Sequence, residues 1–261
     1  MLYEDRIVCF VDILGFREII ESTTDVCGHE IEGKTVALQE ALLATREVLD
    51  ADVERISKSK VITQFSDSIV ISFHVEEESE VFFTLLELLW NQVRLIFHGM
   101  VLRGGVAFGK CHHTDKLVFG PALVEAYEIE SRVAKTPRIV VSESVVEEGS
   151  LRSANWHSPV TERESIEMCL AEDDDGMLFI DYFGGAQSEL DDPECDFPLY
   201  LGHLRSIIST GLQNPDQEVR KKYEWMRSKF NELARACRDA EFVARLSDPD
   251  LQVAYSSIMD V

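Results

Sequence analysis

The chain has 261 residues, of which 45% are hydrophobic, and 25 Lys and Arg against 48 Asp and Glu give a formal net charge of −23. Because nucleic acids and anionic lipids bind proteins largely through Lys and Arg, a surface this acidic argues against nucleic acid and membrane as partners. The sequence has no apolar run of about 18 residues that could span a membrane and no basic-then-apolar leader for export. Its six cysteines include no CxxC pair. We therefore expect a cytoplasmic protein with reduced thiols.

The first part of the chain alternates patterns typical of strands and helices. In chain order they predict a strand at 6–12, helices from Phe16 and over 36–53, a hairpin over 61–73, a helix over 81–99 and a strand over 101–110. Cys111, His112 and His113 with Asp115 could suggest a metal site, but four residues in one short polar segment rarely converge on an ion, and we predict a turn there.

The remaining patterns predict a turn and helix over 118–132, a strand over 138–142 followed by a small helix, and a strand over 177–182. The order is βαββαβ and then αβ, which is typical of a ferredoxin-like α+β fold. After an acidic stretch near residue 190, residues 199–238 have a helical pattern that is broken at Asn214-Pro215. We therefore predict a catalytic domain over 1–187 and a helical C-terminal extension over 188–261.

Two aspartates stand out by their positions. Asp12 ends an apolar strand just before a helix, and Asp67 lies at the tip of the predicted hairpin. In the βαββαβ arrangement these two places are adjacent, so the carboxylates would repel each other unless a cation lies between them. Mg²⁺ and Mn²⁺ prefer such oxygen ligands, and a pair of these ions is a common device for displacement at phosphorus. Each aspartate alone also suits a structural role, as a helix cap or a turn residue.

The turn after Asp12 favours phosphate binding. The backbone N–H groups of Ile13, Leu14, Gly15 and Phe16 lie near a predicted helix N-terminus, which attracts phosphate oxygens. Gly15 would let the chain approach a triphosphate closely, because it has no side chain. Two carboxylates beside such a turn predict metal-assisted phosphoryl chemistry on a nucleoside triphosphate. The bound cations would also offset the repulsion that the acidic chain exerts on that substrate.

Residues 10–16 (FVDILGF) resemble the F-x-D-I-x-G-F signature of the class III nucleotide cyclases, the adenylate and guanylate cyclase catalytic domains. Three further stretches are similar to motifs of that family in the same order: 65–67 (FSD) to the hairpin Gly-Asp, 103–109 (RGGVAFG) to a glycine-containing strand, and 120–128 (GPALVEAYE) to the helix after it. The resemblance covers about residues 5–185.

The resemblance implies that Asp12, Asp67 and the carbonyl of Ile13 hold two metal ions, Mn²⁺ or Mg²⁺, in each active site. The ribose 3′-oxygen then attacks the α-phosphorus and pyrophosphate leaves. It also implies a homodimer with active sites at the interface, and Ile13, Leu14, Gly15, Phe16, Thr63 and Phe65 as nucleotide-binding residues.

The chain departs from the family at the residues that select the base and stabilise the transition state. Thr63 replaces the purine-reading Lys, and Leu117 the purine-reading Asp. Val124 and Glu128 replace the family's Asn and Arg on the following helix. A cation is still needed for the developing charge. Arg103 is our candidate catalytic cation, and Arg132 and Lys135 are the alternatives; each of the three also suits a plain role as a solvated charge or a salt-bridge partner.

Three explanations fit these departures. The first is a pyrimidine cyclase like the uridylate and cytidylate cyclases of the bacterial Pycsar anti-phage systems, which use Mn²⁺ to make cyclic UMP or cyclic CMP; we favour the uridylate enzyme. The second is an adenylate or guanylate cyclase that reads its base with other residues. The third is an inactive nucleotide sensor, against which the retention of Asp12 and Asp67 argues. Tyr127 and Phe65 either line a base pocket or belong to the core.

Overall fold

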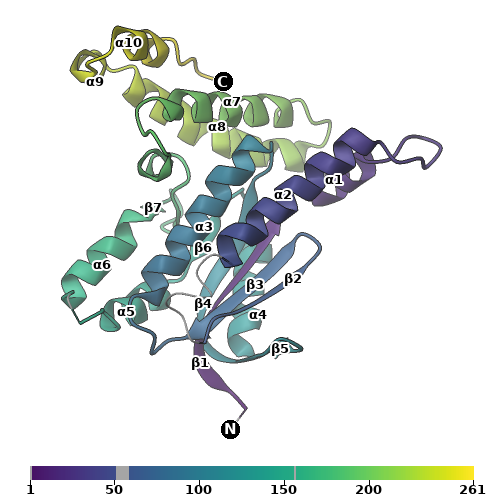
Figure 1. Ribbon diagram of the computed structural model, residues 1–261, viewed down its shortest axis with the longest axis vertical. Coiled ribbons are helices and arrows are strands. Elements are labelled where there is room, and N and C mark those ends of the chain that lie inside the picture. The colour runs from purple at the N-terminus through teal and green to yellow at the C-terminus, as the bar shows by residue number, and fades with distance from the viewer. Residues whose placement is uncertain (1, 51–58, 156) are drawn as a thin grey trace. The chain divides into compact units, whose positions relative to one another are not determined.

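The structure is a computed structural model that describes residues 2–50, 59–155 and 157–261. It divides into two units, Met1–Ile180 and Asp181–Val261 (Figure 1). The first unit combines a sheet with helices, and the described elements of the second unit are helices. The protein is therefore of the α+β class with a helical C-terminal part.

Within the described residues, eight strands form one mixed sheet in the order β2-β3-β1-β4-β6-β8-β7, with β5 paired to β4. The strands are β1 (Glu4–Ile13), β2 (Val61–Phe65), β3 (Ser68–His74), β4 (Leu102–His113), β5 (Val118–Phe119), β6 (Ile139–Val141), β7 (Leu170–Glu172) and β8 (Leu178–Ile180). Strand β1 pairs antiparallel with β3 and β4, and β6 runs parallel to β4. The first four strands have the order of a ferredoxin-like sheet, so this prediction is confirmed.

Helices cover both faces of this sheet (Figure 1). They are α1 (Phe16–Ser22), α2 (Glu32–Asp50), α3 (Glu80–Phe97), α4 (Pro121–Glu128), the π-helix η1 (Ile129–Val133), α5 (Glu143–Leu151) and α6 (Pro159–Met168). Helices α2 and α3 pack against each other, whereas α4 packs on β1 and β4. Side chains on β1 alternate between the two faces, and Val8 joins the core beneath Ala122 and Ala126 of α4.

The second unit contains the 3₁₀-helix η2 (Gly185–Glu189) and the helices α7 (Asp196–Gly211), α8 (Gln217–Cys237), α9 (Ala240–Arg245) and α10 (Pro249–Ser256). The predicted break at Asn214-Pro215 lies between α7 and α8. Asp216 caps α8, because its carboxylate accepts a hydrogen bond from the Glu218 N–H at 2.8 Å. Tyr200, Phe230 and Tyr255 are fully buried and form part of the core of this unit.

Some boundaries differ from the sequence prediction. The predicted turn at Cys111, His112 and His113 is wrong, because these residues extend β4, where His112 and His113 pair with β5. The turn comes after them and is closed by the hydrogen bond from Thr114 N–H to the Leu117 carbonyl. The helix predicted over 36–53 begins earlier, at Glu32, and residues 51–53 lie outside the described residues. Of the helices that the structure describes, none is long and apolar enough to cross a bilayer.

Candidate functional site

Asp12 lies near the end of β1, where its neighbours come from two other strands. In the sheet register it stands opposite Arg103 of β4. On the other side Ser68, the first residue of β3, donates a hydrogen bond from its hydroxyl to Asp12 Oδ1 at 3.2 Å. The Asp12 side chain is 21% exposed, so its carboxylate is largely withdrawn from water. Its environment therefore decides whether it is ionised.

Asp67 lies beside Asp12, as the sequence predicts. Strand β2 ends at Phe65 and β3 begins at Ser68, so Ser66 and Asp67 form the turn of the hairpin. Burial raises the pKa of Asp12 to about 7, and a hydrogen bond with Asp67, the negative charge of Asp67 and that of Glu130 act in the same direction. The pair thus shows the electrostatic conflict expected of two adjacent carboxylates.

Arg103 is the cation next to this pair. Its guanidinium lies 3.8 Å from Asp12 Oδ2 and forms a direct ion pair with Glu130. Glu130 is 3% exposed and belongs to the π-helix η1. Two carboxylates, Asp12 and Glu130, therefore flank one guanidinium, and Asp67 lies beside Asp12, which leaves an excess of negative charge when all three are ionised.

A glycine explains how Glu130 reaches Arg103. A Cβ atom at Gly105 would lie 2.4 Å from the Ala126 carbonyl oxygen and 2.6 Å from Cβ of Ile129. Helix α4 and the start of η1 can approach β4 this closely only because residue 105 has no side chain. The approach brings η1 over β4, and Glu130 contacts Arg103. Glu130 and Ser68 are the two site residues that the sequence analysis missed.

The turn after β1 differs in one respect from the prediction. The Leu14 N–H donates a hydrogen bond to the Val101 carbonyl at 2.9 Å, so it is not free for a phosphate. The side chain of Ile13 is buried, which leaves only its backbone for a ligand. Gly15 has a φ of 74°, a left-handed conformation that favours glycine, and Phe16 begins α1.

The other predicted site residues, which are Phe65, Thr63 and Tyr127, differ in their exposure and in their contacts. Phe65 is 82% exposed and directly precedes the turn that holds Asp67. The Thr63 hydroxyl, two residues earlier, lies 2.9 Å from Nε2 of the buried His113. Tyr127 is half-exposed and packs edge-on against Phe10, with 5.5 Å between the ring centres.

Of the three candidate cations, only Arg103 contacts Asp12 among the contacts that the described residues make. Arg132 is exposed and forms a surface ion pair with Glu128 at 2.9 Å. Lys135 is exposed and lies beyond η1. Arg103 therefore has the position that a catalytic cation would need.

The donor set at Asp12 and Asp67 fits a hard divalent cation. Carboxylate oxygens are the ligands that Mg²⁺ and Mn²⁺ prefer. A cation between the two groups would also remove the repulsion that adds to burial in raising the pKa of Asp12. The backbone carbonyl of Ile13, next to Asp12 in the chain, could add a third oxygen.

No known family model matches the chain, and no curated protein matches it. Among solved structures, a bacterial light-regulated adenylyl cyclase matches with 16% identity over 59% of this chain and 47% of that one, with a TM-score of 0.41. The catalytic core of a rhodopsin-guanylyl cyclase with converted specificity, in complex with ATPαS, matches with 19% identity over 56% of this chain and 80% of that one, also with a TM-score of 0.41. The chain thus spans about half the length of the light-regulated cyclase.

Proposed function

We propose that this protein is a metal-dependent nucleotide cyclase of the class III type. The observation that carries the proposal is the pairing of Asp12 with Asp67, at which burial and the neighbouring charge raise the pKa of Asp12 to about 7. Strongly perturbed carboxylates cluster at functional sites, and a divalent cation bound between these two would relieve their repulsion. We place the catalytic function in the predicted domain over 1–187, which includes the whole sheet unit Met1–Ile180, and propose 188–261 as the helical extension.

In this proposal Asp12, Asp67 and the Ile13 carbonyl hold two divalent cations, Mn²⁺ or Mg²⁺. The bound ions would polarise the ribose 3′-hydroxyl and neutralise the triphosphate. The 3′-hydroxyl would lose its proton to water, its oxygen would form a bond to the α-phosphorus, and the bond to the leaving pyrophosphate would break. Arg103 supplies positive charge beside Asp12, and its ion pair with Glu130 holds the guanidinium there. Gly15 and Phe16 lie at the turn that would face the phosphates.

We propose that the enzyme selects a pyrimidine base, and that it prefers uracil to cytosine. The resemblance places both purine readers of the family at Thr63 and Leu117, and neither side chain can reproduce their charged contacts. Thr63 is moreover engaged with the buried His113. The products would be cyclic UMP or cyclic CMP, which suits a Pycsar-type signal in anti-phage defence.

A homodimer and a cytoplasmic location complete the proposal. Several large apolar side chains are exposed on or near the face of the sheet that α4 covers, as a dimer interface requires: Phe65, Leu117, Val124 and Tyr127. The net charge of −23 argues against nucleic acid and membrane as partners, so the nucleoside triphosphate is the expected polyanionic ligand.

The direct test is to incubate the purified protein with Mn²⁺ and each of the four nucleoside triphosphates and to separate the products by chromatography. We expect a 3′,5′-cyclic monophosphate from UTP or CTP. Product from ATP or GTP alone would show a purine cyclase with other base-reading residues. Nucleotide binding without product would show a sensor.

A further inference from the structure

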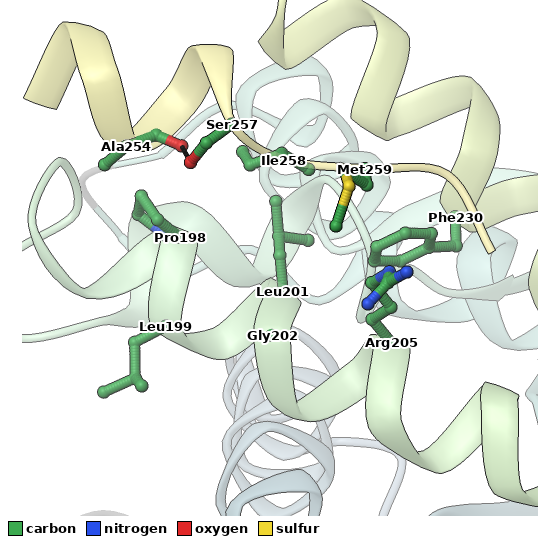
Figure 2. A pocket seen from close by; sticks show the side chains of 10 residues that line it. All are labelled: Pro198, Leu199, Leu201, Gly202, Arg205, Phe230, Ala254, Ser257, Ile258 and Met259. Atoms are coloured by element: carbon green, nitrogen blue, oxygen red, sulfur yellow. Dashed lines mark hydrogen bonds between the residues drawn. The ribbon is translucent and has the colours of Figure 1, made fainter.

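A cavity of about 350 Å³ lies within the helical unit (Figure 2). Its walls come from α7, from Phe230 of α8, and from α10 with the segment that follows it. Its volume is within the range of small-molecule sites, which are mostly apolar with a few polar groups that orient the ligand. Its lining has this character, because apolar side chains such as Leu201, Phe230 and Ile258 surround a single charged residue, Arg205.

A glycine keeps one wall of this cavity open. Leu201, Gly202 and Arg205 lie along α7 and all line the cavity. A Cβ atom at Gly202 would meet no other atom within 4 Å, and its φ is not in the left-handed region. Glycine is among the poorest helix formers, and neither crowding nor backbone conformation calls for it here. What it does in the structure is to leave space beside Arg205 and Leu201.

The charge around Arg205 favours an anion. Arg205 Nε donates a hydrogen bond to the Asp260 backbone carbonyl at 3.4 Å. The Asp260 carboxylate forms ion pairs with Arg235 at 3.4 Å and with Arg238 at 2.5 Å. Within the part of the chain that the structure describes, no carboxylate side chain pairs with Arg205. This end of the cavity is therefore cationic in a chain of net charge −23.

We propose that the cavity binds a small molecule in which a carboxylate is joined to an apolar chain, of the medium-chain fatty acid class. The carboxylate would accept hydrogen bonds from the Arg205 guanidinium, which suits the planar geometry of that group. The chain would lie beside Gly202 against Leu201 and Phe230. This site lies within the helical unit and does not depend on the proposed cyclase activity.

The test is calorimetric titration of the full chain with decanoate, and with decanol as the uncharged counterpart. Decanoate should bind the wild type saturably at one site, at least tenfold more tightly than decanol. Arg205→Gln should weaken decanoate at least tenfold and leave decanol unchanged. Gly202→Leu fills the open space and should abolish binding of both ligands, while circular dichroism and the thermal midpoint show an intact fold. Arg227→Gln, an exposed arginine of α8 outside the cavity, is the matched control and should bind as the wild type does.

Three results would overturn the proposal. The first is no saturable binding of decanoate to the wild type. The second is wild-type affinity in Gly202→Leu, which would place the ligand elsewhere. The third is an equal loss in Arg205→Gln and Arg227→Gln, which would show attraction to surface charge in general.

Discussion

Two polar clusters lie toward opposite ends of one face of β1. The polar groups of one cluster have partners, whereas the other holds adjacent carboxylates that repel each other. The Arg6 cluster comprises Arg6, Ser72, His113 and Thr63, and the Asp12 cluster comprises Asp12, Asp67, Arg103 and Glu130. Arg6 and Asp12 are six residues apart on the same strand, so about 20 Å separates their positions. Between them Val8 and Phe10 pack against α4.

The polar side chains of the Arg6 cluster have hydrogen-bond partners, and Arg6 additionally donates to the Glu4 carboxylate and to the Ser59 carbonyl. Arg6 is 2% exposed and donates from Nε to the Ser72 hydroxyl at 2.9 Å, and to the Ser72 carbonyl at 3.1 Å. The two ring nitrogens of His113 lie 2.8 Å from Ser72 Oγ and 2.9 Å from Thr63 Oγ1. Burial, with the charge of Arg6, lowers the pKa of His113 to about 4, so the ring stays neutral.

The Asp12 cluster keeps an electrostatic conflict that its own residues do not resolve. Besides burial, the charges of Asp67 and Glu130 raise the pKa of Asp12, and one guanidinium, that of Arg103, pairs with both Asp12 and Glu130. A buried network with complete hydrogen bonds stabilises a fold. Like charges that are held close together instead need a counter-ion that the protein itself does not supply. From this comparison we expect the first cluster to serve stability and the second to bind cations.

The largest expected effect concerns Asp67. Asp67→Asn keeps the shape of the side chain and removes its charge. We expect turnover with the preferred triphosphate to fall at least about 100-fold, because mutating even a residue that only contacts a metal ligand typically lowers metal affinity or activity by about 10- to 100-fold. The free energy of unfolding should stay the same or rise, since repulsion with Asp12 is relieved. Steady-state kinetics and urea unfolding measure the two effects. Activity within about threefold of wild type would remove the metal role of Asp67.

The Arg6 cluster should show the reverse pattern. Ser72→Ala leaves Arg6 and His113 without their shared partner, and a buried polar group left unsatisfied costs about 1–3 kcal/mol of stability. Activity per folded molecule should not change. Urea unfolding of Ser72→Ala is compared with Ser206→Ala, an exposed serine of α7. An activity loss without a stability loss would show that the two clusters are not separate in function.

A smaller effect is expected at Glu130. Glu130→Gln removes the charge that holds Arg103 beside Asp12, and we expect a fall in kcat of about tenfold, as for residues that orient a site. Glu128→Gln is the matched control, because it breaks only the surface pair with Arg132. Equal activity in the two variants would contradict a positioning role for Glu130.

The smallest effect is a pH dependence of stability that should come from His113. The unfolded chain binds a proton on this residue near pH 6.5, and the folded chain does so only near pH 4. At His113 the unfolded state therefore takes up more protons between these values, so the contribution of His113 to stability falls as the pH decreases from about 6.5 to about 4, whereas Asp12, whose pKa is raised to about 7, contributes in the opposite direction. Urea unfolding should show wild-type stability declining relative to that of His113→Gln over this range. A constant difference between the two proteins would assign the pH dependence to other groups.

Much of the fold and three of the four members of the Asp12 cluster follow from the sequence. The alternation of β1 and the two-residue turn at Ser66 and Asp67 predict that the two aspartates meet, because the hairpin register leaves few alternatives. The same register places Ser68 next to Asp12, so that neighbour was accessible to sequence reasoning.

Glu130 was not accessible in the same way. Its contact with Arg103 depends on how closely α4 approaches β4, which the packing of Gly105 against Ile129 decides. The error at Cys111–His113 has a similar cause, since β4 is prolonged by pairing with a strand of two residues, too short to give a pattern of its own. The Leu14 amide was misassigned because its partner, Val101, is far away in the sequence.

The central claim is that Asp12 and Asp67 together bind divalent cations, and Mn²⁺ binding followed by electron paramagnetic resonance tests it without requiring turnover. The wild type should bind Mn²⁺ saturably, with an affinity at least about tenfold higher than in Asp12→Asn or Asp67→Asn. Asp115→Asn, which removes an exposed aspartate outside the cluster, should bind as the wild type does. Equal Mn²⁺ affinity in all four proteins would contradict the account.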